Sequence, residues 1–174
     1  EGLLGFTRRL ISIRRSNPVF QRRRFFAGSA DHGGESPMGD IAWLTPAGEH
    51  MSEEDWHQGD AKAVMVFLNG GAIPEMDERG GRVHDDSFLL LFNAHDDPIK
   101  FCMPAEDYGS AWFFEIDTAA HQPPAMSLMA QASVDPIAAA GAGAEAAAVR
   151  VPGDEIEVQA RSLVVLRCPK EGKE

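Results

Sequence analysis

The 174-residue sequence has little cysteine, a single tyrosine and no long hydrophobic run. No stretch approaches the roughly 18 consecutive apolar residues that a membrane-spanning helix needs, so we expect no membrane partner. Cys102 and Cys168 lie in apolar stretches without CxxC spacing, which favours two buried thiols in a reducing cytoplasm over a disulfide between neighbouring strands. The chain is also too short for a (β/α)8 barrel, which takes about 250 residues.

The chain opens with Glu1-Gly2-Leu3-Leu4, which is neither an initiator methionine nor a signal peptide. This start suggests a processed chain or a piece cut from a longer one. The length by itself is that of one domain with its own core.

Positive charge is scarce outside the first 24 residues. That segment holds seven arginines and one glutamate, whereas the other 150 residues hold nine basic and 26 acidic side chains. A body this acidic repels nucleic acid and anionic membranes, because both are bound by neutralising phosphate. The run Arg22-Arg23-Arg24 could contact nucleic acid, but it lacks interleaved aromatic residues, so we favour a solvated loop that contacts acids elsewhere in the chain.

Catalytic and cofactor motifs are missing as well. No glycine-rich nucleotide loop, HExxH or GxSxG motif occurs, and the six histidines show no metal-ligand spacing. Acidic pairs such as Asp96-Asp97 are adjacent in sequence, whereas glycoside hydrolysis needs two carboxylates facing each other across a cleft. We therefore expect no catalytic residue, no metal and no cofactor, and assign Asp85-Asp86 a structural hydrogen-bonding role.

Apolar residues with helical spacing predict one helix over residues 3–16. Leu3, Phe6, Leu10 and Ile13 form a stripe, flanked by Leu4 and Ile11. Asn17-Pro18 ends this helix, since a residue before proline avoids the α conformation.

Beyond residue 40 the pattern changes to short strands separated by turns, which predicts an all-β antiparallel sandwich. A short helical turn is expected after Ser52, and a hairpin loop at 95–98. In the strand 111–117 we place Trp112, Phe114 and Ile116 on one face. The expected strands cover residues 40–45, 62–69, 87–94, 99–103, 111–117, 149–151, 155–158 and 161–168.

Residues 64–68 and 88–92 are continuously apolar instead of alternating. Strands of this kind are covered on both faces. The N-terminal helix could supply part of the cover, and a further domain could supply the rest.

Aromatic side chains are the candidate ligand contacts, since a flat apolar ring matches one face of a sugar. Trp56 follows a short polar helix and has the best prospect of exposure, with Trp43 and Tyr108 as further glycan-contact candidates. Trp112 lies on an apolar face and is expected in the core.

Several segments, in order, resemble the C-terminal end of isoamylase-type glycogen debranching enzymes of the α-amylase superfamily. The most specific motif is VFLNGGAIPEMDERGGRVHDDSFLLLFNAHDDPIKFCMP at 66–104. Ala47 departs from the more usual Pro-Asp-Gly turn, and nothing is recognised through 119–148. The other matching segments are FTRRLISIRRSNPVFQRRRFF at 6–26, DIAWLTPAGEHMSEEDW at 40–56, the strand end from Trp112 to Asp117-Thr118, and ARSLVVLR at 160–167.

The resemblance implies that residues 1–39 are the last helix of a (β/α)8 barrel and a connector. Residues 40–174 are then the C-terminal sandwich, with a long variable loop at 119–148. The parent would hydrolyse α-1,6 branch linkages of glycogen or limit dextrin by a retaining mechanism, with its catalytic carboxylates upstream of this chain. The expected partner is that barrel, with an α-glucan as a further ligand. A glycan-binding module and a self-associating domain, which forms homo-oligomers through exposed apolar surface, remain the alternatives.

Overall fold

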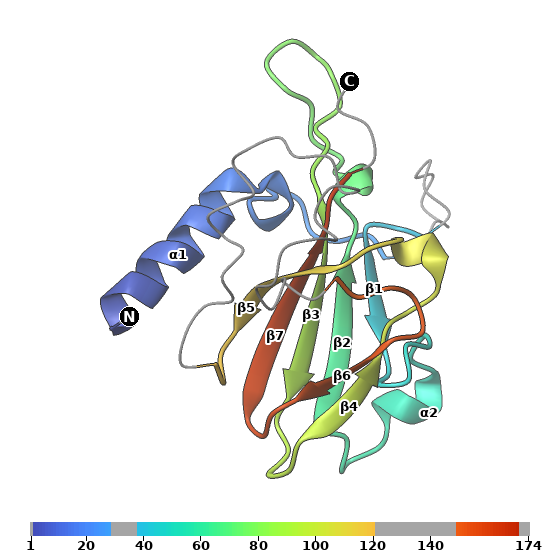
Figure 1. Cartoon of the computed structure of the whole chain (residues 1–174). Helices are drawn as coiled ribbons and strands as arrows, with labels where there is room; N and C mark the ends of the chain where they lie inside the picture. Colours follow the sequence, from blue (N-terminus) through green and yellow to red (C-terminus); the bar gives the residue numbers. More distant parts are fainter. Residues whose placement is uncertain (1, 29–37, 121–148, 171–174) are drawn as a thin grey trace, which may run out of the picture.

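A five-stranded and a two-stranded antiparallel sheet, stacked face to face, form the body of the protein (Figure 1). The computed structural model describes residues 2–28, 38–120 and 149–170. The strands are β1 (Ile41–Leu44), β2 (Ala63–Leu68), β3 (Ser87–Asn93), β4 (Ile99–Cys102), β5 (Phe113–Asp117), β6 (Glu155–Val158) and β7 (Ser162–Cys168). The larger sheet has the order β1-β2-β3-β7-β5, and the smaller one pairs β4 with β6. This arrangement confirms the predicted sandwich.

Within residues 2–28, 38–120 and 149–170, the helices are short except for the first. Along the side of the larger sheet runs α1 (Leu3–Ser16). None of the helices within the described ranges is long and apolar enough to cross a membrane. The other helices of the described part of the chain are η1 (Pro18–Phe20), α2 (Glu53–Trp56), η3 (Gly70–Ala72) and η4 (Glu106–Tyr108).

The inner core fills the space between the two sheets. Trp112 is fully buried there, as predicted, beside Phe67 and Phe101. A second apolar cluster lies on the opposite face of the larger sheet, which we call the outer face. Its buried members are Val19, Val66, Leu68, Ile73, Phe88, Ile116 and Val165. Both clusters draw on β2 and β3, so most of these two strands is covered on both faces, as their continuous apolar sequence predicts.

Two expectations about strand geometry are wrong. The loop at 95–98 closes no hairpin, because β3 pairs with β2 and β7 while β4 pairs with β6 in the other sheet. In β5 the register shifts between Phe114 and Ile116. A β-bulge of this kind breaks the two-residue alternation, so Trp112 enters the inner core while Ile116 joins the outer cluster.

Other expectations are confirmed or fall outside the described residues. Gly48 closes the turn at Pro46-Ala47-Gly48 with φ +83°, a conformation that favours glycine. No disulfide joins Cys102 and Cys168, as the favoured interpretation has it, but both residues are half-buried and not buried as expected. Instead of a strand at 149–151, an isolated bridge pairs Arg150 with Trp112. Most of the loop predicted at 119–148 lies outside the described residues.

Candidate functional site

The helix α1 packs one side of its apolar surface onto the outer face of the larger sheet. Phe6 and Ile13 are partly buried against the outer cluster. They lie seven residues apart, which is about two helical turns, so both point to the same side. This contact covers part of the outer face, as expected from the continuously apolar strands.

The remaining apolar side chains of α1 are exposed. Leu3 is 81% exposed, Leu4 63%, Ile11 47% and Leu10 38%. We call these four residues the exposed stripe. The sequence predicts one stripe that includes Leu3 and Leu10 with Phe6 and Ile13, whereas the structure divides it into a packed part and an exposed part. The exposed part is unusual for a surface helix, whose outward side is ordinarily polar.

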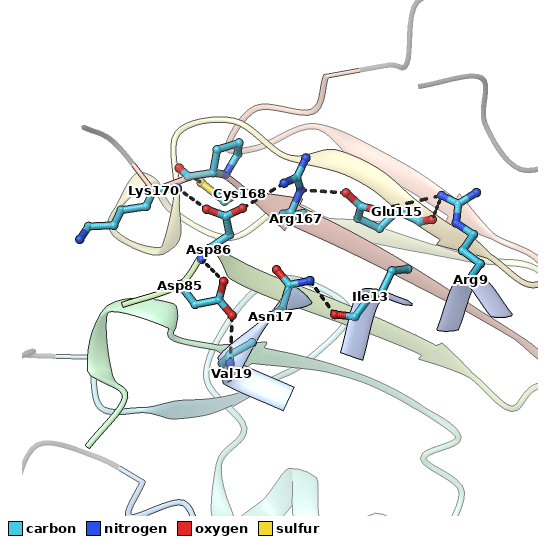
Figure 2. Close-up of polar contacts among 11 residues, drawn as sticks. Arg9, Ile13, Asn17, Val19, Asp85, Asp86, Glu115, Arg167, Cys168 and Lys170 are labelled. Atoms are coloured by element: carbon cyan, nitrogen blue, oxygen red, sulfur yellow. Dashed lines mark hydrogen bonds and ion pairs between the residues drawn. The ribbon is translucent and has the colours of Figure 1, made fainter. Parts of the chain in front are cut away.

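A chain of ion pairs fastens α1 to the sheet (Figure 2). Arg9 of α1 donates a hydrogen bond to the backbone carbonyl of Glu115 in β5, and its guanidinium lies 4.0 Å from the Glu115 carboxylate. The other oxygen of that carboxylate lies 2.8 Å from Nε of Arg167 in β7. Arg167 Nη1 in turn donates to Asp86 at 3.0 Å. The helix is thus held by charge as well as by Phe6 and Ile13.

The two residues just before β3, Asp85 and Asp86, form hydrogen bonds, and Asp85 holds the chain just after α1. Asp85 Oδ2 accepts a hydrogen bond from the backbone N–H of Val19 at 2.9 Å, and Oδ1 accepts one from Asp86 N–H. Asp86 also accepts from Lys170 N–H at 3.0 Å. Burial raises the pKa of Asp85 above its usual value and outweighs the lowering by these two N–H groups. The structural role predicted for Asp85-Asp86 is confirmed.

The arginine run after η1 contacts acids of the sandwich, as expected. Arg22 is buried and donates to Asp40 at 2.5 Å, with its guanidinium 4.2 Å from the centre of the Phe26 ring. Glu75 accepts hydrogen bonds from the backbone N–H groups of Arg23 and Arg24. Burial alone would raise the pKa of Asp40, but hydrogen bonds from two backbone N–H groups and from Arg22 hold it below its usual value.

Two of the three candidate aromatic residues lie together at the edge strand β1. Trp43 and Trp56 are 42% and 54% exposed, and their ring centres are 5.5 Å apart with an angle of 71° between the planes. Ser52 and Asp55 form a reciprocal capping box that starts α2 and so places Trp56 beside Trp43. We call Trp43 and Trp56 the tryptophan pair.

The third candidate, Tyr108, lies elsewhere and is half-buried. Its ring packs edge-on against Phe67 of the inner core at 5.0 Å, and its hydroxyl lies 2.6 Å from Nε2 of His50. Burial, followed by the charge of Asp107, raises the pKa of the Tyr108 hydroxyl. The structure therefore brings Trp43 and Trp56 together and leaves Tyr108 apart from them.

Within the described ranges, no group of three or more histidine, cysteine, aspartate or glutamate side chains is placed to hold a metal ion. The adjacent acids form local structural contacts instead. Asp96 pairs with Arg161, and Asp154 accepts a hydrogen bond from Val151 N–H at 3.0 Å.

Sequence reasoning missed the charged residues that fasten α1. Arg9 and Glu115 are 106 positions apart, so no local spacing relates them. The one signal was Arg9 itself, which lies between Phe6 and Ile13 on the side of the helix that packs. An arginine on a packed face requires an acidic partner, because a buried charge without one is costly.

Fold and site together define an antiparallel β-sandwich domain whose preceding helix exposes apolar side chains. The sequence model of the family described as "Isoamylase, C-terminal" matches residues 40–167. The chain belongs to this family of isoamylase C-terminal domains.

Individual relatives agree with this assignment. The "Glycogen operon protein GlgX homolog" of Mycobacterium tuberculosis (strain ATCC 25618 / H37Rv) is 51% identical over 116 residues, which are 67% of this chain and 16% of the relative. The homolog from Mycobacterium bovis has the same values. A "Glycogen debranching enzyme" of Cronobacter sakazakii is 25% identical over 108 residues, 62% of this chain and 13% of that protein. The matched region is thus about a sixth of the length of the mycobacterial relatives.

Proposed function

We propose that this chain is the non-catalytic C-terminal domain of a glycogen debranching enzyme and that it stabilises the catalytic (β/α)8 barrel by packing against it. The parent would hydrolyse α-1,6 branch linkages of glycogen or limit dextrin by a retaining mechanism. The family assignment and the glycogen-related names of the relatives support the parent's identity. The proposal includes the cytoplasmic location expected from the low cysteine content.

The main support for the proposed docking role is that the apolar surface of α1 is divided into a packed part and an exposed part. The packed part reaches the outer cluster through Phe6 and Ile13, while the exposed stripe is left uncovered by the described residues. Exposed leucine and isoleucine side chains gathered on one helix mark an interaction surface. A helix that packs on both sides fits the junction between two domains.

The proposed boundaries follow from this picture. Residues 1–39 are assigned to the last barrel helix and the connector, and residues 40–174 to the sandwich. The contacts of Arg22 with Asp40 and of Glu75 with the backbone of Arg23 and Arg24 support a connector held firmly to the sandwich. The sandwich would then carry α1 as a fixed surface for the barrel.

The test uses the M. tuberculosis relative, shortened to remove the region that this chain matches. Adding the chain should raise the thermal unfolding midpoint of the shortened relative, because a ligand that binds only the folded state stabilises it. The matched pair of variants is Ile11→Glu, in the exposed stripe, and Ser12→Glu, at the exposed neighbouring position. Ser12→Glu should act like the wild type, and Ile11→Glu should lose most of the effect.

Two results would refute the proposal. One is an unchanged midpoint with excess wild-type chain that is itself folded. The other is sedimentation showing that the chain pairs with a second copy of itself through the exposed stripe and leaves the shortened relative unbound.

A further inference from the structure

The tryptophan pair is a second exposed apolar feature, distinct from the exposed stripe. We infer that Trp43 and Trp56 form a contact site for a neutral α-glucan chain. The choice of α-glucan among sugars rests on the proposed function, whereas the choice of a sugar rests on the chemistry of the site itself.

The two rings offer the apolar faces that a sugar requires. Each is about half exposed, and the rings meet edge to face at 71°, so the edge of one ring covers part of its neighbour's face and the two ring planes are inclined to each other. The face of an aromatic ring carries partial negative charge and attracts the C–H groups on the flat side of a pyranose ring. Inclined faces suit a curved chain, and α-1,4-linked glucan curves from one residue to the next.

Hydrogen bonds hold the tryptophan pair in place before any ligand arrives. Met51 N–H donates to the carbonyl of Trp43 at 3.0 Å, which closes the hairpin after β1. Ser52 N–H donates to Asp55 at 2.8 Å, and Asp55 N–H donates back to the Ser52 hydroxyl at 3.2 Å. A preorganised site loses less conformational entropy when it binds.

The charges around the tryptophan pair favour a neutral polyhydroxyl ligand. Glu53 and Glu54 are exposed in α2 directly before Asp55 and Trp56. Their carboxylates can accept hydrogen bonds from sugar hydroxyl groups. The same charges repel phosphate-bearing ligands such as nucleic acid, in keeping with the acidic body of the chain.

The site is separate from the contact through which α1 is anchored. Trp43 points to the outer face of the larger sheet, since it pairs with Val66 of the outer cluster. It lies at the β1 edge, whereas Arg9 is anchored to Glu115 in β5 at the opposite edge (Figure 1). Glucan binding and barrel docking can therefore be tested by different substitutions.

The experiment measures the migration of the 174-residue chain in gels containing glycogen, and the tryptophan fluorescence during titration with maltoheptaose. Both should report binding by the wild type. Trp56→Ala should weaken it about tenfold or more, as expected for the loss of one stacking ring, and Trp56→Phe should retain most of it. Phe25→Ala is the matched control, because Phe25 is an aromatic residue that is 99% exposed and is not part of the tryptophan pair.

Several outcomes would overturn the inference. These are a wild-type chain that is not retarded by glycogen, retardation that Trp56→Ala leaves unchanged, and self-association in sedimentation that Trp56→Ala abolishes. Ile11→Glu should leave glycogen retardation intact, and Trp56→Ala should leave stabilisation of the shortened relative intact. The two ideas can therefore fail independently.

Discussion

The Asp85 carboxylate, two residues before β3, accepts a hydrogen bond of 2.9 Å from the backbone N–H of Val19. This bond joins the segment after α1 to a strand in the middle of the larger sheet, where Val19 is buried. Val19 lies only three residues after the end of α1. The bond therefore fixes the position of the C-terminal end of this helix relative to the sandwich. The direction in which the exposed stripe points is therefore set by the sandwich itself.

Removing the Asp85 carboxylate should destabilise the chain. Asp85→Ala leaves the N–H of Val19 without its acceptor, and an unsatisfied buried donor costs about 1–3 kcal/mol. Chemical denaturation should show this loss in the free energy of unfolding, and amide hydrogen exchange at Val19 should accelerate. The control Asp96→Ala removes a pair with Arg161 in which both side chains are mostly exposed, so it should cost at most about 1 kcal/mol. Equal losses in the two variants would contradict this account of Asp85.

The pKa values of Asp40 and Asp85 should be shifted in opposite directions from the ordinary value of an aspartate. Carbon-13 NMR of the carboxyl groups should place the pKa of Asp40 below that of a reference peptide and the pKa of Asp85 above it. Since the folded pKa of Asp40 is lowered, its stabilising contribution is present above the unfolded pKa and is lost as the pH falls through the folded pKa. Asp85 has the opposite sign, so its ionisation lowers stability as the pH rises from its unfolded to its folded pKa. The reverse order of the two values would show the contacts to be misassigned.

The ion pairs at Glu115 should contribute more to the free energy of unfolding than an exposed ion pair does. The side chains of Arg9, Glu115 and Arg167 are 15%, 16% and 24% exposed. Glu115→Gln leaves two guanidinium groups without their shared carboxylate and should cost about 1–2 kcal/mol. The matched change Glu155→Gln breaks the exposed pair with Lys100 and should cost less than about 1 kcal/mol. Urea denaturation of both variants provides the comparison, and an unaffected Glu115→Gln would mean that the Glu115 carboxylate contributes little to holding α1.

Gly70 should tolerate no side chain. A Cβ atom there would lie 2.2 Å from the carbonyl oxygen of Asp86 and 2.3 Å from that of Asp85. Both are backbone atoms just before β3, so the segment that binds Val19 would have to move. Gly70→Ala should cost about 3 kcal/mol or more, whereas Gly59→Ala, with open space around it, should be nearly neutral. Thermal unfolding of the two variants provides the comparison, and a neutral Gly70→Ala would refute the close approach.

Local patterns in the sequence predict most of the elements. The seven-residue spacing of Phe6 and Ile13, about two helical turns, indicates α1, and Ser52 followed by Asp55 indicates the start of α2, because both signals act within a few residues. Strand pairing is not predicted by such local patterns. The chain from β3 to β4 passes to the other sheet, and nothing in the turn residues 95–98 distinguishes that path from a hairpin.

The candidate site was predictable only in its parts. Trp43 and Trp56 are recognisable as candidates from the sequence. Their contact, however, depends on the backbone geometry of the hairpin after β1 and of the capping box, which composition does not reveal. The division of the apolar surface of α1 is accompanied by the contact between Arg9 and Glu115, which are 106 positions apart in the sequence. Long-range charge pairing of this kind leaves no periodic trace in the sequence.

The most direct test of the central claim is a binding titration between this chain and the shortened M. tuberculosis relative, with heat release as the readout. The account predicts a one-to-one complex, with Ser12→Glu binding like the wild type and Ile11→Glu binding about tenfold or more weakly, since a charge would be buried in an apolar contact. Binding that is equally strong in both variants, or no binding by a folded wild-type chain, would contradict the claim that the exposed stripe docks on the catalytic domain.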